Sequence, residues 1–138
     1  MYIKVNVKQI GSRRKPVAAE QFFLSKKPET VRELIVESVR TCVEEYNERM
    51  DMGEEKPLEQ QQIDAMSQVG KITFGMSYNG KKADFIKAAE HALISYEDGI
   101  YKIFVGNQML EQLEDNIEIR EESEVTFIRL TMLTGTLW

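Results

Sequence analysis

The sequence predicts one α+β domain in which a long helix crosses a mixed β-sheet. Three observations predict it. Residues 3–8 alternate between apolar and polar side chains, residues 31–46 carry an apolar stripe at helical spacing, and residues 125–133 are rich in β-branched and aromatic side chains. The length of 138 residues is in the range of one domain. We therefore expect a single domain over residues 1–138, with a helical insertion within it over residues 51–98.

The first two elements are expected to form a β-hairpin. The alternation in residues 3–8 is typical of a strand with one buried and one solvated face. A polar turn with glycine and proline at its ends follows at residues 11–16, and residues 17–24 form a second extended run. The tip of this hairpin is basic, with Arg13, Arg14 and Lys15.

A long helix is predicted after the hairpin. Thr30 and Glu33 have the spacing of a capping box, in which two side chains satisfy free backbone N–H groups of the first helical turn. Cys42 falls on the apolar stripe, so we expect a core thiol there; as the only cysteine it forms no disulfide within the chain. The stripe consists of Val31, Leu34, Ile35, Val39, Cys42, Val43 and Tyr46.

The middle of the chain predicts two further helices and a short extended segment. Pro57 suits the first position of a helix that runs to about Val69. Residues 70–78 alternate briefly and predict a short strand or extended loop, which ends at the turn signal Asn79-Gly80. A second helix is expected at residues 82–97. Its apolar face would consist of Phe85, Ile86, Ala89, Ala92, Leu93 and Tyr96.

The C-terminal third predicts three strands. Residues 100–105 are β-rich, Gly106-Asn107 marks a turn, and residues 108–110 can form a short return strand. After an acidic segment, residues 125–133 form the last strand. Its two apolar faces would be Val125 and Phe127 on one side, and Ile128, Leu130 and Met132 on the other.

Two stretches of the chain resemble ubiquitin. Residues 102–111, 115–117 and 121–127 follow its pattern of a strand ending in a hydrophobic-Gly turn, a Gln-Leu-Glu segment, an Asn-Ile element, a charged Ser turn and a last strand. Pro28-Glu29-Thr30-Val31 is similar to the Pro-x-Asp-Thr-Ile start of the ubiquitin helix. The resemblance covers about 90 of the 138 residues and implies a ubiquitin-like β-grasp fold, while residues 51–98 have no ubiquitin counterpart.

The C-terminus bears on what this resemblance implies for function. Ubiquitin and its conjugated relatives end in Gly-Gly, whose carboxylate is activated as an adenylate and passed on as a thioester. This chain ends Thr134-Gly135-Thr136-Leu137-Trp138, with one glycine and a bulky apolar end. We therefore expect a non-conjugating interaction module that docks to a partner protein and regulates or scaffolds it. The alternative is a protein modifier that is activated after proteolytic processing at Gly135.

Two surfaces are candidates for docking to the partner. The family presents an apolar patch on the outer face of its sheet, and Phe104, Ile128, Leu130 and Met132 would lie there in this chain. The alternative is that the inserted helices cover this face. The second candidate is the basic hairpin tip, because residues 1–27 carry seven basic residues against one acidic, and residues 107–124 seven acidic against one basic.

The sequence contains no convincing catalytic or cofactor-binding set. His91 is the only histidine and Cys42 the only cysteine, so the chain lacks the ligands of a zinc site. Neither residues 70–71 nor residues 79–82 fit a phosphate-binding loop. The net charge of −5 argues against nucleic acid as a partner. No apolar run approaches the roughly 20 residues of a membrane span, so we expect a cytoplasmic protein without a cofactor.

Overall fold

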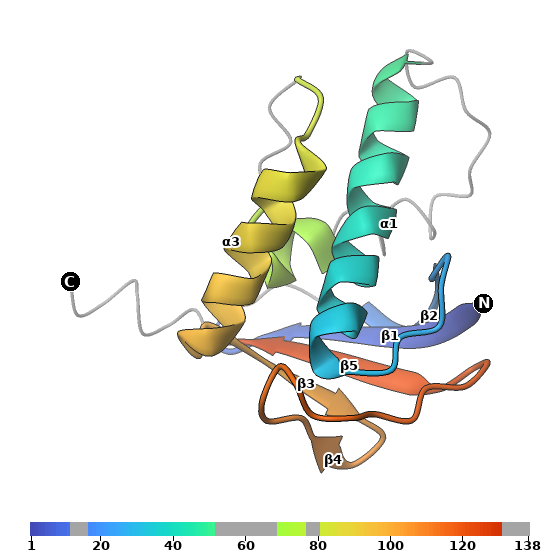
Figure 1. Ribbon diagram of the computed structural model, residues 1–138, viewed down its shortest axis with the longest axis vertical. Coiled ribbons are helices and arrows are strands. Elements are labelled where there is room, and N and C mark those ends of the chain that lie inside the picture. The colour runs from blue at the N-terminus through green and yellow to red at the C-terminus, as the bar shows by residue number, and fades with distance from the viewer. Residues whose placement is uncertain (12–16, 52–68, 77–80, 131–138) are drawn as a thin grey trace.

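The computed structural model describes residues 1–11, 17–51, 69–76 and 81–130, and this part of the chain is α+β as predicted. Two helices, α1 (Val31–Asp51) and α3 (Phe85–Glu97), pack against each other on one face of a sheet (Figure 1). The sheet is mixed and has five strands. They are β1 (Tyr2–Gln9), β2 (Val17–Phe23), β3 (Tyr101–Val105), β4 (Gln108–Met109) and β5 (Glu124–Arg129).

The strand order is β2-β1-β5-β3-β4, with the parallel pair β1 and β5 at the centre and antiparallel pairs elsewhere. The predicted hairpin is confirmed, since β1 and β2 pair antiparallel. Their register shifts between Val5 and Val7, and Ala19 opposite adopts a φ of 52°. The side-chain oxygen of Asn6 accepts a hydrogen bond from the Ala19 N–H at 2.8 Å, so the irregularity leaves this backbone donor satisfied.

The start of α1 follows from the predicted capping box. The Thr30 hydroxyl accepts a hydrogen bond from the Glu33 N–H at 3.2 Å. The Glu33 carboxylate accepts from the Glu29 N–H at 2.9 Å, one residue before the donor that a capping box normally uses. Both bonds satisfy backbone donors at the helix entrance and fix where the chain enters the layer above the sheet.

The hydrophobic core lies between the sheet and the helices. Val125 and Phe127 are fully buried on the helix-facing side of β5, as the sequence predicts. The Phe74 ring meets the rings of Phe127 and Tyr101 edge-on, with centroids 5.7 and 5.6 Å away. The Tyr101 hydroxyl donates to the Ala92 carbonyl at 2.7 Å, which ties the sheet to α3.

The short strand or extended loop predicted over residues 70–78 is wrong within the described residues. Val69–Thr73 form a π-helical turn, η1, and the Phe74 N–H donates to the Val69 carbonyl at 3.3 Å. Ile72 in this turn and Phe74 directly after it are both buried, as they would be in a strand. The turn packs on β5, whose two edges are already occupied by β1 and β3. The helix predicted from Pro57 to Val69 lies outside the described residues except for Val69.

Helix α3 begins three residues later than the expected start at Lys82. Asp84 is its N-cap, and the carboxylate accepts from the Lys87 N–H at 3.2 Å. The prediction that Ile86 belongs to the buried face is wrong, because its side chain is 61% exposed. Phe85, under the Arg40 guanidinium at 4.3 Å, and buried Ala89 occupy the side towards α1, and Ile86 is rotated by about 100° from Phe85.

Candidate functional site

The outer face of the sheet carries an apolar surface between lysines. Ile128 on β5 is the Cα partner of Lys8 on β1 and of Lys102 on β3. One row away, Phe104 is the partner of Thr126 and of Met109. Since successive side chains of a strand point to opposite faces, this set lies on the side away from the buried Phe127. We call Phe104, Met109 and Ile128, together with Leu130 directly after the end of β5, the outer-face patch.

The residues of the outer-face patch are partly exposed. Phe104, Ile128 and Leu130 are half-buried, and Met109 is 45% exposed. The two described helices both lie on the opposite face (Figure 1), so α3 does not cover the patch as the alternative prediction allowed. Met132, the fourth predicted member, lies outside the described residues.

Lysines lie on both sides of the centre of the patch. Lys4 has Glu124 as its Cα partner on β5, which places opposite charges on neighbouring strands. Lys8 and Lys102 instead both face Ile128. The centre of the outer face therefore combines an apolar side chain with two flanking positive charges.

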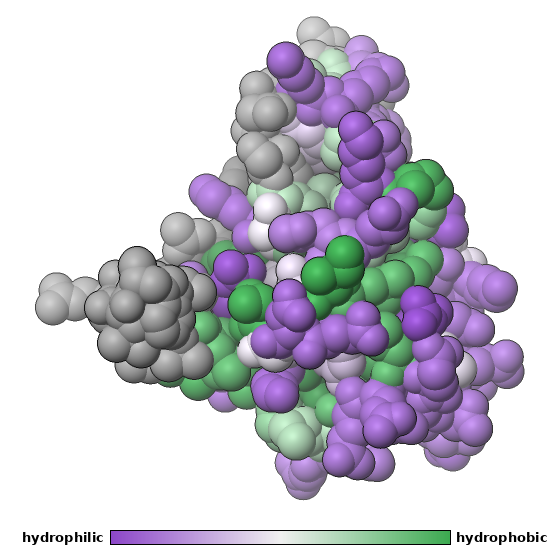
Figure 2. Space-filling model, turned by 60° about the vertical axis from the view of Figure 1, so that its left-hand side comes forward, coloured by the Kyte–Doolittle hydropathy of each residue, from purple (hydrophilic) through white to green (hydrophobic). Residues whose placement is uncertain are grey.

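The other predicted surfaces lie outside the described residues. These are the basic hairpin tip with Arg13, Arg14 and Lys15, and the C-terminal segment with Gly135. Exposed apolar side chains also occur away from the outer-face patch: Tyr2 and Phe23 meet edge-on at 5.3 Å, and Ile86 and Ile94 lie on α3. On the side of the molecule turned forward in Figure 2, apolar surface is interrupted by hydrophilic side chains.

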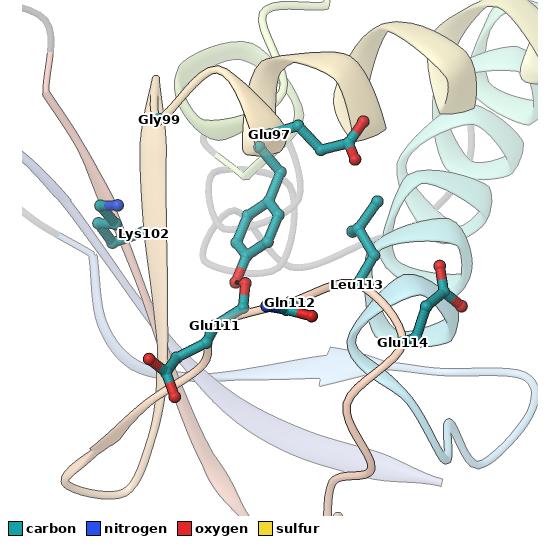
Figure 3. A pocket seen from close by; sticks show the side chains of 8 residues that line it. Glu97, Gly99, Lys102, Glu111, Gln112, Leu113 and Glu114 are labelled. Atoms are coloured by element: carbon teal, nitrogen blue, oxygen red, sulfur yellow. Dashed lines mark hydrogen bonds between the residues drawn. The ribbon is translucent and has the colours of Figure 1, made fainter.

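A pocket of about 410 Å³ lies between the end of α3, β3 and the segment after β4. Glu97 and Glu114 lie on its helix side and Lys102 and Glu111 on its sheet side (Figure 3). The Tyr96 hydroxyl donates to the Glu111 carbonyl at 2.7 Å. Burial raises the pKa of Tyr96, and the charges of Asp115 and Glu111 raise it further, so this phenol stays protonated and serves as a structural donor.

The nucleophiles and metal ligands of the described residues do not form a reactive set. Cys42 is 2% exposed in the core, as the sequence predicts, and burial raises the pKa of its thiol. His91 is exposed on α3. Within the described ranges, no three His, Cys, Asp or Glu residues are grouped so that they could hold a metal ion. The helices described also include none with the length and apolar character needed to cross a membrane.

One polar cluster was not predicted from the sequence. Arg129 Nη1 donates to the Ile72 carbonyl at 3.1 Å, and a Cβ on Gly75 would lie 3.8 Å from this nitrogen and 3.3 Å from His91 Nε2. These residues come from β5, η1, the segment after η1, and α3, and nothing in their spacing along the chain indicates that they meet.

Comparison of the chain with protein-family models, with curated proteins and with solved structures found no match in any of the three.

Proposed function

We propose that the chain is a ubiquitin-like β-grasp domain that docks to a partner protein through its outer-face patch and regulates or scaffolds that partner without being conjugated to it. The strand order β2-β1-β5-β3-β4, with a central parallel pair and a long helix on one face, supports the β-grasp assignment. The segment of residues 51–98 is then an insertion that carries η1 and α3.

The single observation that carries the docking proposal is the row Lys8, Ile128 and Lys102 on the outer face. An apolar side chain between two cations is complementary to a partner segment that presents an apolar side chain beside carboxylates. Apolar contact supplies most of the affinity in such an interface, while the charges steer the encounter and select acidic partners. The expected partner is therefore a protein with an acidic, apolar segment.

The experiment measures the affinity of the chain for its purified partner. The partner is captured from native cells with the full chain, identified by mass spectrometry, purified, and titrated against wild type, Ile128→Ser and a Lys8→Glu/Lys102→Glu double variant. We expect each variant to weaken the affinity by about 10-fold or more, because both remove contacts from the centre of the interface. The wild-type affinity should also fall as NaCl is raised, because exposed charges are screened.

A matched control is available in Lys26→Glu/Lys27→Glu, which makes the same charge change at two exposed lysines after β2. This control should bind within about 2-fold of wild type. The docking proposal would be overturned if the outer-face variants bound the partner with wild-type affinity. It would also be overturned if the control lost as much affinity as the Lys8→Glu/Lys102→Glu variant, because the loss would then be due to the net charge of the chain. Circular dichroism of every variant confirms that it is folded.

A further inference from the structure

Helix α3 presents an apolar and acidic stripe to solvent. Ile86 and Ile94 are 61% and 56% exposed, the two highest values among the large apolar side chains of the described residues. Glu90 and Glu97 are also exposed, and Leu93 is half-buried. At about 100° per residue, these side chains lie within about 100° of the helix circumference. We call Ile86, Glu90, Leu93, Ile94 and Glu97 the α3 stripe.

The carboxylates of the α3 stripe are not neutralised within the described part of the chain. None of the ion pairs there uses Glu90 or Glu97. Arg32 attracts Glu97 electrostatically, but its ion pair is with Glu114. Lys87 borders the stripe directly after Ile86 and does not lie between the two carboxylates along the helix. A surface that is apolar and acidic is complementary to one that is apolar and basic.

The outer-face patch of the same chain is such a surface. Lys8, Ile128 and Lys102 occupy one row across the adjacent strands β1, β5 and β3. Neighbouring strands are about 4.8 Å apart, so the two lysines start about 10 Å from each other, with Ile128 between them.

The α3 stripe repeats this spacing with the opposite charge. Glu90 and Glu97 are seven positions apart, which corresponds to about 10.5 Å along a helix and to an offset of only about 20° around its axis. Leu93 and Ile94 lie halfway between them. If α3 lies across the strands of another copy, each carboxylate meets one lysine and the apolar pair meets Ile128.

We propose that the chain associates with itself head to tail, with the α3 stripe of one copy bound to the outer-face patch of the next. This inference rests on the proposed function, because both use the outer-face patch. The α3 stripe and the patch lie on opposite sides of the sheet (Figure 1), so the contact is heterologous and two copies do not close it. Association therefore continues beyond a dimer and competes with the partner for the patch.

Sedimentation velocity of the purified full chain at increasing concentration tests the inference. We expect the average sedimentation coefficient to rise with concentration and to fall again as NaCl is added, because exposed charges are screened. Glu90→Lys/Glu97→Lys and Lys8→Glu/Lys102→Glu should each weaken association by about 10-fold or more. An equimolar mixture of these two variants should associate again, because it restores opposite charges at every contact.

A matched control is Glu44→Lys/Glu118→Lys, the same charge change at exposed residues on α1 and after β4, and it should associate as wild type does. The inference would be overturned by a wild type that stays monomeric up to about 1 mM, by unchanged association of the α3 variant, or by a mixture that does not associate. None of these results overturns docking to the partner. The α3 variant keeps the outer-face patch and should bind the purified partner with wild-type affinity.

Discussion

Replacing neighbouring residues of β5 should distinguish its two faces by their energetic cost. Phe127 is 0% exposed and its ring packs edge-on against Phe74 at 5.7 Å, whereas Ile128 is half-buried on the opposite face. Phe127→Ala should lower the free energy of unfolding by about 3–5 kcal/mol, from lost burial and the cavity that remains. Ile128→Thr keeps the β-branched shape and replaces a half-buried ethyl group by a hydroxyl, so it should cost about 1 kcal/mol.

Urea unfolding followed by circular dichroism measures both values. A domain of this kind is stable by about 5–15 kcal/mol, so Phe127→Ala can leave too little folded protein, and Phe127→Leu then provides the core measurement. The refuting result is a loss at Ile128 that matches the loss at Phe127. It would mean that Ile128 is part of a core, and the outer-face patch could not serve as a docking surface.

Three further predictions concern stability. Thr30→Ala should cost about 1 kcal/mol in urea unfolding, because the Glu33 N–H loses its acceptor, while Thr30→Asp should cost little. Burial raises the pKa of Cys42 and of Tyr101 above their ordinary values. Both groups stay neutral in the folded state, so stability is unaffected by them below about pH 8.5 and falls as they ionise in the unfolded chain, the cysteine from about pH 8.5 and the tyrosine from about pH 10. The free energy of unfolding should then fall by up to about 1.4 kcal/mol per pH unit for each group, and Cys42→Ala should reduce this slope. Gly106→Ala should cost about 1–2 kcal/mol in thermal unfolding from backbone strain alone, since φ is +59° and a Cβ there would meet no atom within 4 Å; no loss would contradict this.

The elements that sequence reasoning located are those with local signals. The alternation at Ile3, Val5 and Val7, the capping residues Thr30 and Glu33, and the alternation along β5 each act within a few residues, and the structure confirms them. The same alternation placed Phe104 and Ile128 away from the helices, as the register has them, while Leu130 lies just past the end of β5. Whether α3 covers that face could not be predicted, because it depends on where α3 packs, which is a tertiary property.

The misses have tertiary causes. Ile72 in the π-helical turn and Phe74 directly after it are buried, and a strand would have produced the same apolar spacing. Ile86 is apolar and next to the buried stripe of α3, yet the width of the contact with α1 leaves it in solvent. The meeting of Arg129 and His91 at Gly75 joins residues from three distant parts of the chain, and a single sequence contains no signal for such an encounter.

Photo-crosslinking in native cells tests the central claim, docking through the outer face, most directly. A photoreactive phenylalanine analogue replaces Phe104 in the outer-face patch, and the control places it at Glu44, an exposed position on α1. We predict that position 104 crosslinks to one partner through a peptide rich in Asp and Glu, and that Lys8→Glu/Lys102→Glu abolishes this product. Crosslinking of the same partner from position 44, with none from position 104, would contradict the account.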